Sequence, residues 1–234
     1  LFGFNFRDKA AYSSSLTEYY WTTSGFGGDL QIMPPRASML IKAYFAGSRY
    51  RMNMEEESFD PRFSYLNSLL FGFRFVRYMK NQTLSYGLEI NNLTTDYSYY
   101  SNAFNAFQQR ENSTEVGAYL QYHLSIGNFV IDPGFRFQYY ATLSETSPEP
   151  RLALKYNILD HFAVKLAGGW YSQNLISAIS DRDIVNFFQG CLSAPVDLVN
   201  PGQGDINGYY LQKSQQIIGG AEAEIGGRFF LNIE

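Results

Sequence analysis

The feature that most constrains this chain is an alternation of apolar and polar residues with a period of two. Over Val116–Ile126, Val, Ala, Leu and Tyr side chains alternate with Gly, Tyr, Gln, His and Ser. Successive side chains of a β-strand point to opposite faces, so this stretch has one apolar face and one largely polar face. The same alternation predicts further strands over Phe2–Arg7, Leu69–Met79, Leu84–Ile90, Phe129–Ala141, Leu152–Ile158 and Phe162–Trp170.

The polar faces of these strands carry charged residues, and the surroundings of those charges decide the class of protein. An open soluble sheet exposes them to water, whereas a membrane barrel turns them toward a wet lumen and its apolar face toward lipid. The sequence has no run of about 18 apolar residues, which a spanning helix needs. Aromatic residues reach 18%, which favours strands and membrane interfaces. The residues expected to line the lumen are Arg74, Glu89, Asp132, Arg136, Lys155, Lys165, Glu222 and Glu224.

The connections between the strands favour the membrane barrel. Short links that contain Gly, Asn or Asp suit the backbone angles of tight hairpins. Longer polar links alternate with them, which is typical of outer-membrane barrels with short periplasmic turns and longer extracellular loops. The short links are Lys80-Asn81, Gly127-Asn128, Asp160-His161 and Gly226-Gly227. The long links are Ser98–Asn112, Ser144–Glu149 and Gln173–Tyr210.

The resulting prediction is an all-β chain that forms a transmembrane antiparallel up-and-down β-barrel, with about twelve strands visible. In the first third of the chain we expect strands near Ala10–Thr22, Ala37–Phe45, Arg49–Glu56 and Arg62–Met79, with a tight turn at Gly47-Ser48. The apolar face of each strand should point outward to lipid. The side chains expected to contact lipid are Phe71, Phe73, Phe75, Phe135, Phe137, Leu154 and Leu166.

The alternation also predicts how neighbouring substitutions differ. Phe137→Arg should impair insertion, because it places a charge on the lipid face. Gln138→Arg, one residue along, should be tolerated, because that side chain is expected to point into the lumen.

Three stretches carry a resemblance to a known family. Pro150–Asn157 opens with Pro-Arg and leads through a brief turn into Phe162–Asn174, which closes in Gly-Gly-Trp-Tyr-Ser-Gln-Asn. After a long link, Leu211–Glu222 returns as another strand. Together these stretches resemble the barrel of TonB-dependent outer-membrane receptors.

The resemblance implies a multi-pass protein of the bacterial outer membrane, whose barrel of about 22 strands is plugged by an N-terminal domain. Such receptors import scarce nutrients, namely iron chelates, cobalamin or oligosaccharides. Their energy is passed on by the periplasmic protein TonB, which contacts the plug domain. We expect residues 1–234 to form part of such a barrel, with the plug domain outside this sequence. Both ends of the sequence read as the inside of a strand, which favours part of a longer receptor over a small complete barrel.

The long link Gln173–Tyr210 is the candidate substrate-binding segment. Loops of this length in compact domains are usually functional or disordered, and ordinary loop packing is the competing interpretation. The alternation of turns puts this link on the extracellular side, where a small molecule or oligosaccharide arrives first. Its mixture of charged, amide and aromatic side chains suits a small-ligand site. The residues concerned are Asp181, Arg182, Asp183, Phe187, Phe188, Asp205 and Asn207.

Catalytic, metal and nucleic-acid functions find little support in the sequence. His123 and His161 fall in a strand and a turn with no nucleophile elbow nearby, so we expect no enzyme activity. With two histidines and the single Cys191, we expect no metal site and no cofactor. Glu222 and Glu224 lie two residues apart, but lumen lining explains them better than glycoside hydrolysis. The net charge of −4 argues against binding to nucleic acid.

Three functions share this strand pattern and stay open. The first is an energised receptor, and the second is a passive porin-type diffusion channel. The third is a barrel scaffold in a surface protein complex, with a surface lipoprotein as its partner. Outer-membrane lipid is the expected partner in every case, and a plug domain would discriminate the first function from the second.

Overall fold

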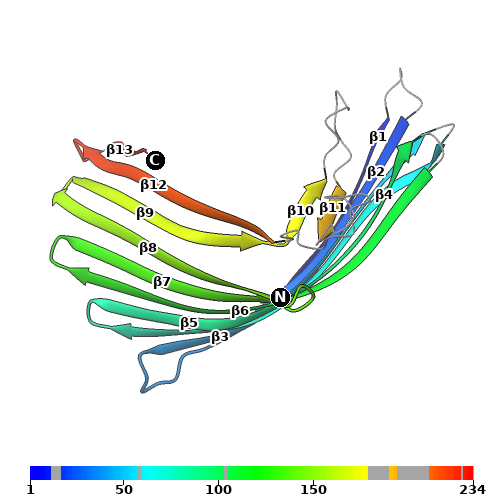
Figure 1. The fold of residues 1–234 in the computed structure, drawn as a ribbon. Helices are drawn as coiled ribbons and strands as arrows, with labels where there is room; N and C mark the ends of the chain where they lie inside the picture. The colour runs from blue at the N-terminus through cyan, green and yellow to red at the C-terminus, as the bar shows by residue number, and fades with distance from the viewer. Residues whose placement is uncertain are drawn as a thin grey trace.

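A computed structural model describes residues 1–11, 17–56, 59–102, 105–178, 190–193, 211–227 and 229–233. These residues form an antiparallel sheet of 11 strands and a separate two-stranded hairpin (Figure 1). The strands are β1 (Phe2–Ala11), β2 (Thr17–Ile32), β3 (Met39–Glu56), β4 (Phe59–Met79), β5 (Gln82–Asn102), β6 (Asn105–Ile126), β7 (Phe129–Tyr140), β8 (Glu145–Leu159), β9 (Phe162–Gln173), β10 (Leu175–Ala178), β11 (Gly190–Ser193), β12 (Gln212–Ile225) and β13 (Phe229–Ile233). In the described part of the chain, no helix has the length and apolar character of a membrane span.

The predicted all-β, up-and-down arrangement is confirmed. Each strand of the large sheet pairs with its neighbour in the sequence, except that β9 pairs with β12, with the β10–β11 hairpin between them in the chain. The sheet curves strongly, and β10 and β11 lie on its concave side (Figure 1). β1 and β13 are its two edges, so the described strands form an open portion of a barrel wall.

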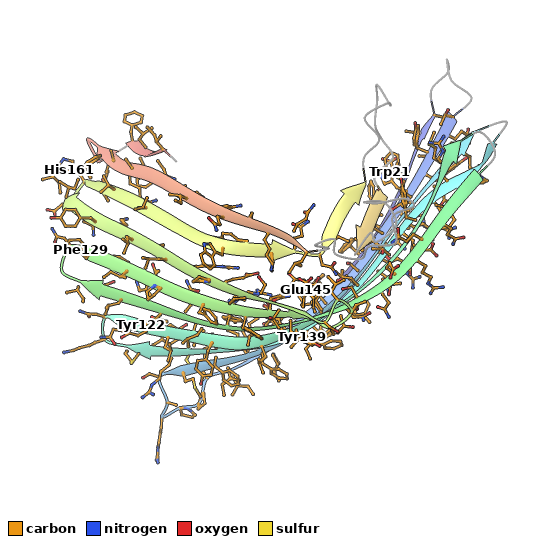
Figure 2. All side chains as sticks on the ribbon, viewed as in Figure 1. Trp21, Tyr122, Phe129, Tyr139, Glu145 and His161 are labelled. Atoms are coloured by element: carbon orange, nitrogen blue, oxygen red, sulfur yellow. The ribbon has the colours of Figure 1, made fainter. Side chains whose placement is uncertain are left out.

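The four predicted tight turns are confirmed, and they lie at one end of the sheet. Phe129, next to one of these turns, and His161, within another, mark this end in Figure 2, whereas Trp21 lies at the other. Gly127, Gly226 and Gly227 adopt φ angles of 56°, 62° and 66°, which residues with a Cβ atom rarely adopt. We assign this end to the periplasm, because outer-membrane barrels have short turns there.

Two predicted long loops are wrong, because the strands extend into them. β5 and β6 occupy most of the predicted loop Ser98–Asn112, and β8 begins at Glu145, inside the predicted loop Ser144–Glu149. The predicted strand Ala10–Thr22 is also wrong, because it spans the end of β1 and the start of β2.

The predicted turn at Gly47-Ser48 is wrong as well, and the two strands predicted on either side of it are the single strand β3. Gly47 pairs with Phe26 on β2 and with Leu69 on β4. A methyl group at Gly47 would come within 2.5 Å of the Phe26 ring and 3.2 Å of Leu69. The glycine therefore leaves room for two large neighbours, and no turn is needed to explain it.

The strand register gathers large apolar side chains on the convex face. One row of paired residues runs through Phe45, Phe71, Ile90, Val116 and Tyr139 on five consecutive strands. Of the side chains predicted to contact lipid, those that lie exposed on this face are Phe71, Phe73, Phe135, Phe137, Leu154 and Leu166. The seventh, Phe75, is partly covered because it stacks on Tyr86, with ring centroids 5.1 Å apart.

Toward the extracellular end, the two faces exchange character. Beyond the apolar band, the outward positions on β3 to β6 are polar: Arg49, Asn67, Asn92 and Thr114. On the concave face at this level, Met52, Met54 and Tyr97 form a buried cluster, against which Tyr19, Trp21 and Tyr50 pack. These ends of the strands therefore extend beyond the membrane. Because their outward residues are polar, their sequence resembles that of a loop.

The orientation of the first strand is a further correction. Its apolar residues, which were expected to point outward, lie on the concave face: Phe2, Phe4 and Phe6. Phe4 pairs with Gly25, and a methyl group there would come within 2.7 Å of the Phe4 ring. Arg7 points outward instead, because it pairs with Thr22 on β2, which in turn pairs with the outward Arg51 on β3.

Candidate functional site

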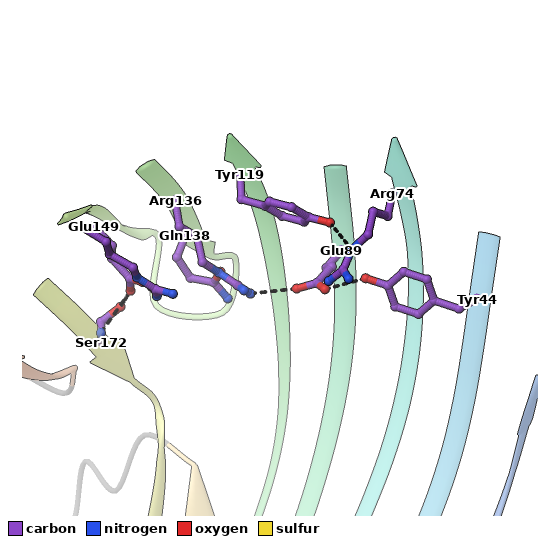
Figure 3. A network of polar contacts seen from close by, with 9 residues as sticks. Tyr44, Arg74, Glu89, Tyr119, Arg136, Gln138, Glu149 and Ser172 are labelled. Carbon is purple, nitrogen blue, oxygen red and sulfur yellow. Dashed lines mark hydrogen bonds and ion pairs between the residues drawn. The ribbon is translucent and has the colours of Figure 1, made fainter. Parts of the chain in front are cut away.

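A network of charged and polar side chains crosses the concave face at the level of the apolar band (Figure 3). Tyr44 on β3 donates a hydrogen bond to Glu89 on β5. The other carboxylate oxygen of Glu89 lies 3.1 Å from a guanidinium nitrogen of Arg136 on β7. Arg136 also donates from Nε to Oε1 of Gln138, at 3.0 Å. The network thus ties together strands that are not adjacent in the sheet.

Arg74 on β4 and Tyr119 on β6 extend this network. Arg74 donates from Nε to the Tyr119 hydroxyl at 2.9 Å. These two side chains, with Glu89, Asp132 and Arg136, line a hollow of about 360 Å³ on the concave face. A hollow with guanidinium, carboxylate and phenol groups can hold a polar surface, such as that of another domain or a solute.

A second charge cluster lies nearer the periplasmic end. Glu222 on β12 accepts hydrogen bonds from Lys155 on β8, at 2.5 Å, and from Lys165 on β9. Lys165 also donates to Oδ1 of Asn232 at 3.3 Å. Glu224 lies on the same face, and its backbone N–H donates to the carbonyl of His161 at 2.8 Å. This cluster joins the last four strands of the sheet.

At the other end of the network, the chain leaves the sheet and turns inward. The nearly buried Glu149 accepts a hydrogen bond from Arg151 at 2.8 Å and one from the Ser172 backbone N–H at 3.0 Å. Just beyond β9, the buried Asn174 donates from Nδ2 to Oγ of Ser113 at 2.6 Å. β11 then lies against β4, β5 and β6 (Figure 1). The segment after β9 therefore begins on the concave side of the sheet.

The register places all eight residues predicted to line the lumen on the concave face: Arg74, Glu89, Asp132, Arg136, Lys155, Lys165, Glu222 and Glu224. Their role in lining an enclosed lumen stays a prediction. The seven residues predicted to contact substrate lie outside the described residues: Asp181, Arg182, Asp183, Phe187, Phe188, Asp205 and Asn207.

One grouping on the concave face was missed by the sequence reasoning. His123 lies between Asp132, with Nδ1 to Oδ1 at 2.6 Å, and Ser125, with Nε2 to Oγ at 3.3 Å. Acyl transfer also needs donors for the oxyanion, and the Ser125 backbone N–H is already bonded to the Asn81 carbonyl at 3.0 Å. We therefore interpret these three side chains as contacts that hold β6 against β7, and not as a catalytic site. The period of two could have shown Ser125 beside His123, but only the register brings in Asp132.

Comparisons with known proteins agree with this architecture. A family model described as "TonB dependent receptor-like, beta-barrel" matches residues 2–170. Among curated proteins, none matches the chain in sequence.

Three solved structures illustrate the likeness in fold. A mutant of the ferric enterobactin receptor PfeA from Pseudomonas aeruginosa is 13% identical with a TM-score of 0.58, over 91% of this chain and 33% of that one. The RagAB peptide importer is 10% identical with a TM-score of 0.54, over 88% and 28%. The siderophore receptor PirA from Pseudomonas aeruginosa is 14% identical with a TM-score of 0.51, over 95% and 49%. The chain therefore spans from about a quarter to about half of the length of these proteins.

Proposed function

The chain belongs to the TonB-dependent receptor family, and from this premise we propose that the complete protein imports a scarce nutrient across the bacterial outer membrane. The barrel strands described above are its membrane wall. The proposed cargo is an iron chelate, cobalamin or an oligosaccharide. The proposed energy source is TonB in the periplasm, which acts through a plug domain outside residues 1–234.

The observation that carries the proposal is the pairing of charges on the concave wall. Arg136 is matched by Glu89, and Lys155 and Lys165 share Glu222. Open channels that select by charge use rings of side chains of one sign. A wall whose charges are paired across strands instead offers fixed donors and acceptors to a domain that fills the lumen. This favours a plugged importer over a passive diffusion channel.

The position of the segment after β9 supports its proposed role in substrate binding. Asn174 donates a hydrogen bond to Ser113 on the concave side of the sheet, and β11 lies against β4 to β6. We propose that a solute arriving from outside the cell meets this connection first. We therefore keep Asp181, Asp183 and their neighbours as the proposed substrate contacts.

The proposed partners follow from this arrangement. Outer-membrane lipid contacts the apolar convex face, and TonB acts from the periplasmic side. A surface lipoprotein is proposed as a partner at the extracellular rim, where β1 to β6 project beyond the apolar band.

The test is uptake by the complete receptor in cells limited for iron, cobalamin or an oligosaccharide. Deleting 181–205, which also removes β11, should abolish growth. A heat-modifiability gel should still show a folded barrel, because β11 is not a strand of the 11-stranded sheet and surface loops tolerate changes in length. A matched pair of variants sharpens the result. Asp183→Ala should weaken uptake, whereas Asp96→Ala should not, because Asp96 lies on the outward face and is bonded to Gln108.

Two outcomes would contradict the proposal in different ways. Normal uptake by the folded deletion variant removes the segment from the binding site. Uptake that persists when the inner membrane is de-energised moves the protein to the class of passive channels.

A further inference from the structure

Three arginines gather on the outward face just beyond the apolar band. Arg7 on β1 and Arg51 on β3 both pair with Thr22 on β2, which lies between them, and Arg49 is two residues before Arg51 on the same face of β3. All three are exposed. The next outward row toward the membrane contains Gly3, Phe26, Gly47 and Leu69, which begin the apolar band.

The contacts that these arginines make within the described residues are with neutral side chains. Arg51 donates to Oδ1 of Asn53 at 3.2 Å, and Arg49 lies 5.8 Å from the centre of the Tyr65 ring. In the portion of the chain that the structure describes, no carboxylate is paired with any of the three.

Two acidic side chains on the same outward face already have partners. Asp96, on the same row as Arg51 but two strands away, accepts a hydrogen bond from Gln108 at 3.0 Å. Glu18 accepts a hydrogen bond from Tyr20 and forms an ion pair with Lys9 at 2.9 Å. The hydrogen bond from Tyr20, which has the larger effect, and the contact with Lys9 hold the pKa of Glu18 below its ordinary value. Glu18 therefore stays ionised beside Lys9. The three arginines are therefore available to an anion from outside the chain.

Below the arginines, the same strands form an apolar groove of about 360 Å³. Its outward walls are Leu30, Phe45, Phe71 and Phe73, and the small Ala43 forms part of its floor. Ala43 is six residues from Arg49 along β3, which corresponds to about 20 Å at roughly 3.3 Å per residue. This is similar to the length of a lipid from its headgroup phosphate to well along its acyl chain.

We propose that this surface binds one phosphorylated glycolipid molecule of the outer leaflet, with its phosphate on the arginines and an acyl chain in the groove. Charge complementarity and the continuity of the groove with the lipid-facing band support this occupant. Guanidinium groups bind phosphate oxygens with two parallel hydrogen bonds. Each basic residue near an anionic membrane surface strengthens binding by about 5-fold.

The experiment measures binding of a phosphorylated glycolipid to the complete receptor in zwitterionic nanodiscs, by native mass spectrometry. The double variant Arg49→Gln, Arg51→Gln should weaken binding by about 25-fold. Arg110→Gln is the matched control, because Arg110 lies on the same outward row on β6, beside Asp96 and away from the groove. It should leave binding unchanged.

A second pair of variants tests the groove without changing charge. Ala43→Trp should fill it and weaken binding at least 10-fold, whereas Ala118→Trp, on the same outward row, should not. A heat-modifiability gel shows that each variant is folded. Equal loss in Arg110→Gln, or no loss in Ala43→Trp, overturns the proposal. It is also overturned if the dephosphorylated glycolipid binds as well, or if inorganic phosphate alone binds the arginines with the same affinity.

Discussion

A charge placed at the centre of the outward face should be much more costly than one placed on the concave face of the same strand. On β6 the outward positions in the apolar band run from Val116 to Leu124, and Leu120 is the middle one. From Leu120 to either end is about 13 Å along the strand, or roughly 9 Å of depth at a tilt near 45°. Leu120 is therefore close to the midplane of an apolar band about 25 Å tall.

Leu120→Arg should destabilise the barrel in bilayers by about 2–4 kcal/mol, the cost of an arginine at the midplane. Val116→Arg, at the edge of the band, should cost only about 0–1 kcal/mol. Gln121→Arg is the matched control. Gln121 lines the hollow on the concave face together with Asp132, so a new guanidinium there meets water and a carboxylate.

The assay is a urea titration of the complete receptor, folded into phosphocholine vesicles and followed by heat-modifiability on a gel. The prediction concerns the difference between Leu120→Arg and Gln121→Arg, so errors common to both cancel. Similar midpoints for these two variants would refute the assignment of the faces. A cost at Val116 equal to that at Leu120 would refute the assigned depth.

Three further perturbations follow from single contacts. Glu222→Gln should destabilise the barrel by about 1 kcal/mol, because Lys155 and Lys165 lose their shared carboxylate, and a double-mutant cycle with Lys165→Met should recover part of the loss. Asn174→Ala should expose the segment after β9 to protease while Thr146→Ala, at an exposed outward position on β8, does not, and equal cleavage of both would argue against the Ser113 anchor. Gly47→Leu should destabilise the sheet by about 1–3 kcal/mol through overlap with Phe26, and Phe26→Ala should restore stability in the double variant.

The period of two was sufficient to predict the fold class and the outward face of most strands. Phe71, Phe135 and Leu166 lie where the alternation places them, because a strand offers only two faces. The tight turns were also predictable, since Gly127 and Gly226 need backbone angles that few other residues adopt.

The errors arose where the environment changes along a strand. The outward residues Gln108, Arg110 and Asn112 lie beyond the apolar band, so the polar start of β6 resembles the loop that the sequence predicts over Ser98–Asn112. The alternation at Phe4 and Phe6 predicts the strand correctly, but which of its faces points to the membrane depends on pairing with β2. Register is a non-local property, and a single strand does not contain it.

The same limit applies to the concave site. The sequence indicated that Arg136 and Glu89 share a face, but not that they meet at 3.1 Å across the intervening strand. It also suggested that Gln138→Arg would be tolerated. The structure changes that expectation, because Gln138 is buried and accepts a hydrogen bond from Arg136, so a second guanidinium there would be repelled. Gln121 is the better control for this reason.

The most direct test of the central claim is a spin-label scan along β5 from Leu84 to Asp96 in the complete receptor, reconstituted in bilayers. Accessibility to oxygen reports contact with lipid, and accessibility to a water-soluble nickel chelate reports contact with water. The even-numbered positions up to Ile90 should respond to oxygen, and those from Asn92 onward should respond to the chelate. The odd-numbered positions, including Glu89, should show no lipid contact at any depth. A scan without this alternation, or one in which Asn92 to Asp96 remain in lipid, would contradict the placement of this sheet as an outer-membrane barrel wall.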